Sequence, residues 1–161
     1  MHLRLTTTNY KQSKRYNNDM NELNQTPCYK KILVIDDDAV DRYITTRTIK
    51  KYAFAQEVII KESGESALEY LKSLADMPEE VPNLIFLALR MPAMDGFDFL
   101  EEYKNLPEVI KKKCTVMMLS TSLYRGDLER AKNNKYVSRF LNKPLDKGML
   151  NEISLIGNPV S

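Results

Sequence analysis

The stretch that decides the fold reads Ile32-Leu33-Val34-Ile35-Asp36-Asp37-Asp38. Its first four residues are aliphatic and mostly β-branched, which is typical of a strand buried on both faces of a parallel sheet. Three carboxylates follow, and Asp38 is placed to cap the next helix. In that helix Val40, Ile44 and Thr48 share one face. The stretch predicts a strand-helix unit with acidic side chains at the carboxyl end of the strand.

The same unit recurs along the chain. The predicted strands cover residues 32–35, 58–60, 84–89, 116–119 and 138–141. Amphipathic helices follow them, after residue 38, at about 64–75, and at 97–103, 127–133 and 145–155. Short apolar strands that alternate with such helices require a parallel sheet covered on both faces and joined by right-handed crossovers. We therefore expect an α/β three-layer sandwich of five βα units.

The composition suits a single domain. The chain has 161 residues, 43% of them hydrophobic and 29% charged, which is enough for one ordinary core. Residues 1–28 are polar and rich in Asn, Thr and Gln, and we expect a flexible tail there because such a segment cannot offset its ordering entropy. We assign residues 29–156 to the folded domain and residues 157–161 to a C-terminal tail.

Several function classes are disfavoured. The net charge is +2, from 24 basic and 22 acidic residues, so we expect no nucleic-acid partner. No apolar run has the length of a signal peptide or membrane helix, so we expect a cytoplasmic protein without membrane contact. Cys28 and Cys114 lack metal-ligand spacing, and the only histidine, His2, lies in the predicted tail. This placement argues against a histidine kinase or phosphotransfer role for the chain itself.

Polar residues collect at the carboxyl ends of the predicted strands, where ligands of such sheets bind. They are Asp36, Asp37, Ser120, Thr121 and Lys143. Two neighbouring carboxylates stay ionised most easily when a cation bridges them, and Mg²⁺ prefers such oxygen ligands. An acidic run before a helix also serves simply as a cap with a favourable dipole interaction, so both interpretations stay open.

These features, in this order and spacing, resemble the receiver domain of two-component response regulators. The resemblance covers about residues 31–155 and rests on four motifs, which are Ile32-Leu33-Val34-Ile35-Asp36-Asp37-Asp38, Leu87-Ala88-Leu89-Arg90-Met91-Pro92-Ala93-Met94-Asp95-Gly96, Leu119-Ser120-Thr121 and Phe140-Leu141-Asn142-Lys143-Pro144. It implies a flavodoxin-like (βα)5 fold with strand order 2-1-3-4-5. Since no output domain follows, we expect a stand-alone receiver.

The resemblance also implies the chemistry of the pocket. Asp37 would bind Mg²⁺ directly, Asp36 would bind it largely through water, and the backbone carbonyl of Arg90 would complete the protein ligands. Ser120 and Lys143 would contact a phosphoryl group.

The resemblance further implies a conformational switch and two kinds of partner. Thr121 and Phe140 would be the switch residues, and phosphorylation would reshape the surface formed by the fourth helix, the fifth strand and the last helix. A sensor histidine kinase or a histidine phosphotransfer protein would supply the phosphoryl group. A downstream protein partner would read the reshaped surface.

Ala88 departs from the family pattern. The position four residues before Pro92 normally holds the aspartate that accepts the phosphoryl group, and a methyl group offers neither nucleophile nor metal ligand. We therefore expect a weakened Mg²⁺ site and no self-catalysed phosphotransfer, so the chain as it stands is not an enzyme. Either Ala88 disables an ordinary phosphorelay receiver, or the chain is a natural pseudo-receiver that acts as an interaction module. A flavin or nucleotide binder would need a glycine-rich phosphate loop, which the sequence lacks.

Overall fold

The computed structural model describes residues 26–156, so most of the predicted N-terminal tail (1–28) and all of the predicted C-terminal tail (157–161) lie outside the described residues. Five strands form one sheet in the order β2-β1-β3-β4-β5, and every neighbouring pair is parallel. This order confirms the predicted flavodoxin-like arrangement. The strands are β1 (Tyr29–Ile35), β2 (Ala55–Lys61), β3 (Leu84–Ala88), β4 (Thr115–Ser120) and β5 (Val137–Asn142).

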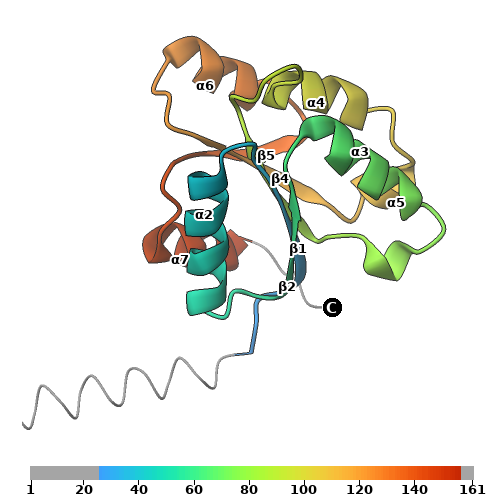
Figure 1. Cartoon of the computed structure of the whole chain (residues 1–161), viewed down its shortest axis with the longest axis horizontal. Helices are drawn as coiled ribbons and strands as arrows, with labels where there is room; N and C mark the ends of the chain where they lie inside the picture. Colours follow the sequence, from blue (N-terminus) through green and yellow to red (C-terminus); the bar gives the residue numbers. More distant parts are fainter. Residues whose placement is uncertain (1–25, 157–161) are drawn as a thin grey trace, which may run out of the picture.

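Helices cover both faces of the sheet (Figure 1). They are α2 (Ala39–Lys51), α3 (Gly64–Ser73), α4 (Gly96–Tyr103), α5 (Glu108–Lys111), α6 (Arg125–Lys132) and α7 (Lys147–Ile156). One core joins the sheet to α2 and α7, and a second joins its other face to α3, α4, α5 and α6. The sequence did not predict α5 or the 3-10 turn Pro78–Glu80, because segments this short show no helical periodicity.

The aliphatic run of β1 is buried on both sides, as predicted. Ile32 and Val34 belong to the core under α2 and α7, whereas Leu33 and Ile35 belong to the core under α3 and α4. None of the four is more than 1% exposed. This alternation follows from the two-residue period of a strand, so β1 contributes side chains to both cores.

The buried face of helix α2 is not the face that the sequence predicted, which carries Val40 and Ile44. Its buried residues are Thr45, Thr46 and Ile49, while Val40 is 65% exposed and Ile44 36% exposed. The start of the helix is as predicted, since the side chain of Asp38 accepts a hydrogen bond from the backbone N–H of Asp41 at 2.9 Å. Threonine presents a β-branched methyl group, which lets it pack on a sheet more readily than its polarity indicates.

The aromatic cluster at α4 contains a poorly paired polar atom. Tyr103 is 1% exposed and packs against Phe99 and Tyr136, with ring centroids 5.8 and 5.4 Å away. Its hydroxyl has no partner at ordinary hydrogen-bond distance among the described residues. Its polar neighbour is the thiol of Cys114, which donates to the carbonyl of Pro82 at 3.1 Å. Burial, and after it the negative form of this thiol, raises the pKa of the phenol. The hydroxyl therefore has only a weak sulfur partner.

We predict that Tyr103→Phe raises the free energy of unfolding by about 1 kcal/mol, because a weak sulfur partner does not offset the cost of removing the hydroxyl from water. Urea denaturation measures the change. Tyr43→Phe removes the same atom from an exposed ring and should stay within about 0.5 kcal/mol of the original chain. A loss of stability in Tyr103→Phe, with Tyr43→Phe unchanged, would contradict the prediction.

Candidate functional site

The strands that carry the predicted site end at one edge of the sheet. Ala88, the last residue of β3, pairs with Leu119, and Ser120, the last residue of β4, pairs with Asn142 near the end of β5. Because parallel strands share a direction, the loops that follow them converge. The register therefore brings together segments that are far apart in the sequence.

Asp36 is the buried acid of the site. It follows β1 directly and is 3% exposed. Its Oδ1 accepts a hydrogen bond from the backbone N–H of Asp38 at 3.0 Å, and its Oδ2 accepts one from Nζ of Lys143 at 2.7 Å. Each oxygen of this carboxylate thus has a partner within the protein. Asp37, by contrast, is exposed.

Lys143 joins two carboxylates. Its Nζ lies 2.7 Å from Asp36 and 2.8 Å from Oδ2 of Asp41 in the first turn of α2, and its side chain is 12% exposed. Burial lowers the pKa of Lys143, but the hydrogen bonds and negative charges of the two carboxylates outweigh that effect and leave the pKa raised. The ammonium group therefore keeps its charge at neutral pH and balances the acidic edge of the sheet.

Arg42 fixes the backbone of the acidic loop. Its Nη1 donates to the carbonyl of Asp36 at 3.0 Å and to that of Asp37 at 2.7 Å, while Nη2 lies 3.2 Å from the carboxylate of Glu62. One guanidinium group thereby ties the loop after β1 to the segment after β2. A planar fork of donors is suited to such multiple contacts.

The third strand brings no polar side chain to the site. Ala88 is 1% exposed. The loop after it turns back so closely that a Cβ on Gly96 would lie 2.8 Å from the carbonyl oxygen of Ala88, which explains the glycine there. The side chain of Arg90 turns away and pairs with Asp127 of α6 at 2.7 Å. Asp95 caps α4 in a reciprocal capping box with Asp98.

Ser120 and Thr121 occupy different environments. Ser120 is 3% exposed, its Oγ accepts from the N–H of Ser122 at 3.0 Å, and its carbonyl accepts from the N–H of Lys143 at 2.9 Å. This last bond joins the loops after β4 and β5, where the Lys143–Pro144 peptide is cis. Thr121 is exposed, so its hydroxyl lies outside the packed part of the site.

Phe140 lies on the side of the sheet that faces α6. The ring is half-buried against the larger core, and it lines a groove of about 460 Å³ between α6 and β5, together with Leu128 and Arg139. The predicted switch aromatic is therefore in contact with both the core and an open groove.

The donor groups fit Mg²⁺ poorly in this arrangement. Asp36 is held by Lys143 and a backbone N–H, Ala88 contributes no oxygen from its side chain, and Asp37 remains as the exposed carboxylate. Among residues 26–156, no group of three or more His, Cys, Asp or Glu side chains is placed to hold a metal ion. Mg²⁺ usually needs one or two carboxylates and keeps several waters, so Asp37 is the carboxylate open to it here, and Asp36 would have to be shared with the ammonium of Lys143.

Sequence reasoning missed three charged residues that shape the site, namely Asp41, Arg42 and Asp127. Asp41 was visible only as a carboxylate in the first turn of a helix, where a favourable dipole interaction is the ordinary explanation. Arg42 also pairs with Glu62 after β2, and Asp127 pairs with Arg90 after β3. No local sequence pattern indicates these two distant contacts.

Comparisons with known proteins agree with this architecture. Residues 32–154 match the response regulator receiver domain. Response regulator Rcp1 from Synechocystis is 31% identical over 100 residues, which are 62% of this chain and 67% of Rcp1. Histidine kinase 2 from Arabidopsis thaliana is 35% identical over 95 residues, which are 59% of this chain but only 8% of the kinase. Related domains thus occur in proteins of very different length.

Solved structures give the same result. The two-component response regulator from Cytophaga hutchinsonii is 26% identical, with a TM-score of 0.73 over 80% of this chain and 98% of that one. The receiver domain of the Arabidopsis thaliana histidine kinase CKI1, complexed with Mg²⁺ and BeF3⁻, is 26% identical with a TM-score of 0.65 over 79% of this chain and 89% of that one. Together with the match over most of the chain, these similarities show that this protein belongs to the response regulator receiver domain family.

Proposed function

We propose that this chain, as it stands, is a receiver domain that signals through protein binding without accepting a phosphoryl group at residue 88. The pairing of Lys143 carries the proposal. Its ammonium group is held by Asp36 and Asp41, at 2.7 and 2.8 Å, and no carboxylate from β3 competes for it. Without a nucleophile at Ala88 the chain does not catalyse its own phosphotransfer.

Two kinds of partner follow from the family. The similarity to histidine kinases supports a sensor histidine kinase or histidine phosphotransfer protein as one partner. The groove beside Phe140 supports a downstream protein partner on the surface formed by α6, β5 and α7.

We propose a single-domain regulator, since the matched region makes up two thirds of Rcp1. No helix within residues 26–156 is long and apolar enough to cross a membrane, and the proposed partners fit a cytoplasmic location.

A phosphorelay receiver disabled at residue 88 is the second candidate. The ordered Ser120 and Lys143 favour it, because they are the groups that would contact a phosphoryl oxygen. The Mg²⁺ in the CKI1 receiver supports a metal in such a pocket. With an aspartate restored at residue 88, that carboxylate would hold the metal together with Asp36 and Asp37, and the metal would supply positive charge beside the phosphoryl group.

Restoring the acceptor separates the two candidates. We expect that Ala88→Asp gains one phosphoryl group on incubation with Mg²⁺ and acetyl phosphate, as read by intact mass, while the original chain and an Ala88→Asn control gain none. A gain on Ala88→Asp supports the second candidate, a competent pocket that lacks only its nucleophile, whereas no gain on Ala88→Asp supports a domain that acts through binding alone. Phosphorylation of the original chain would overturn the proposed function.

The metal response gives an independent prediction. Without Mg²⁺, Ala88→Asp should be less stable than the original chain, because three carboxylates would then repel one another with only the ammonium group of Lys143 to neutralise them. At about 100 times the dissociation constant, Mg²⁺ should stabilise Ala88→Asp by about 2.7 kcal/mol through binding linkage and the original chain far less. Thermal unfolding with and without Mg²⁺ measures both. Equal responses of the two proteins would contradict the prediction.

A further inference from the structure

A groove runs along α2 on the side of the edge strand β2. It has a volume of about 640 Å³ and is lined by residues from Ala39 to Lys51 of the helix and by Ile60 of β2. A helix rises about 1.5 Å per residue, so these lining residues span about 18 Å. The groove is therefore elongated, and it is separate from the groove beside Phe140.

The floor of the groove is apolar and uncovered. Ile60 is 43% exposed and Tyr43 is 62% exposed. Thr46 also lines the groove, and its buried hydroxyl has no hydrogen-bond partner among the described residues. Strand β2 pairs only with β1, so its outer edge is unpaired within the described part of the chain. A partner segment that covered this floor would remove apolar surface from water.

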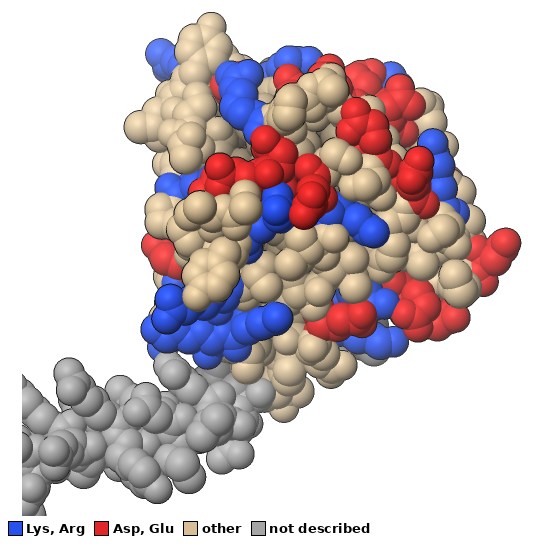
Figure 2. All heavy atoms as spheres, viewed as in Figure 1, with Lys and Arg blue, Asp and Glu red and all other residues tan. Residues whose placement is uncertain are grey.

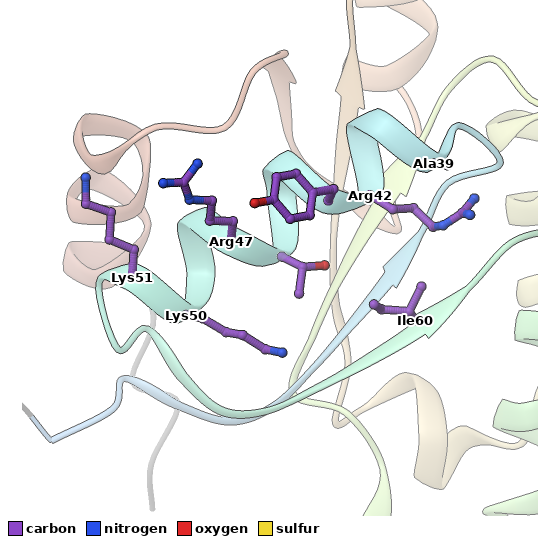
Figure 3. A pocket seen from close by; sticks show the side chains of 8 residues that line it. Ala39, Arg42, Arg47, Lys50, Lys51 and Ile60 are labelled. Atoms are coloured by element: carbon purple, nitrogen blue, oxygen red, sulfur yellow. The ribbon is translucent and has the colours of Figure 1, made fainter.

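The walls of the groove are basic. Arg42, Arg47, Lys50 and Lys51 line it, and no carboxylate does. Figure 3 shows Arg42 and Lys50 extending from α2 toward the β2 side, with Ile60 between them. Arg42 is engaged by the acidic loop, but Arg47 and Lys50 form no ion pair with any residue from 26 to 156. Two cations beside an apolar floor are thus available for a ligand.

We propose that this groove binds a short acidic segment of a partner protein. Carboxylates of the segment pair with Arg47, Lys50 and Lys51, and one apolar side chain of the segment covers Tyr43 and Ile60. Charge complementarity and the elongated shape carry the proposal, since an extended peptide of six residues spans about 20 Å. The proposal goes beyond the function proposed above and does not depend on it.

The charge pattern favours a short acidic segment over a long polyanion. The groove ends at Ala39, beside Asp37, Asp38 and Asp41, so a nucleic acid that followed the groove would meet like charge. Figure 2 shows basic side chains gathered over the C-terminal part of α2 and acidic side chains gathered above them on the same face. A segment with its acidic residues toward the C-terminal end of α2 fits this polarity.

The test uses the full chain and a defined probe, the acetylated and amidated peptide Glu-Asp-Glu-Leu-Ser-Gly, whose acidic residues lie at one end and whose only large apolar side chain is leucine. We expect saturable shifts in amide NMR spectra along residues 39–51 and at Ile60. The double variant Arg47→Ala, Lys50→Ala should bind about tenfold more weakly. The variant Lys112→Ala, Lys113→Ala loses the same charge at an exposed turn after α5 and should bind as the original chain does.

A separate substitution tests how much the apolar floor contributes to peptide binding. Ile60→Thr keeps the β-branched shape of a strand residue and should weaken binding severalfold without changing its salt dependence. Amide spectra of the free variants establish that each is folded. No saturable binding up to about 1 mM peptide, or equal weakening in both double variants, would overturn the proposal. Tighter binding of a thymidine hexanucleotide or of anionic vesicles in the same groove would overturn it as well.

Discussion

One ammonium group, that of Lys143, balances the acidic edge of the sheet. It reaches from the loop after β5 to Asp36 after β1 and to Asp41 on α2, and thus joins both ends of the sequence of the domain. A buried carboxylate without such a partner is costly. The position of Lys143 is set in turn by its backbone bond to Ser120, so the loops after β1, β4 and β5 form one unit.

Strand β3 contributes no polar side chain to this group of loops. In the proposed function, Ala88 supplies neither a charge nor a nucleophile, and Lys143 pairs only with Asp36 and Asp41. The chain then lacks the phosphorylation that would move Phe140 in an ordinary receiver. Its partners would instead recognise surfaces that are already present in the unphosphorylated domain. Two surfaces of different chemistry are available, namely the groove beside Phe140 and the basic groove along α2.

The sequence predicted the parallel sheet and the loops of the site, because β-branched runs and the residues after them are local signals, whereas the strand order was predicted only through the resemblance to receiver domains. The sequence did not predict features that depend on contacts between residues far apart in the chain. The buried face of α2 is set by packing of Thr45 and Ile49 on the sheet, not by the apolar stripe through Val40 and Ile44. The role of Asp41 could not be predicted either, because its partner lies 102 residues away.

A double-mutant cycle tests the central claim most directly. Unfolding free energies of Asp36→Asn, Lys143→Gln and the double variant should give a coupling energy of about 1 to 3 kcal/mol, as for residues in one ion-pair network. A parallel cycle with Asp37→Asn, whose exposed carboxylate forms no ion pair with the described residues, should give a coupling several times smaller. A coupling between Asp36 and Lys143 that is indistinguishable from zero would contradict the account.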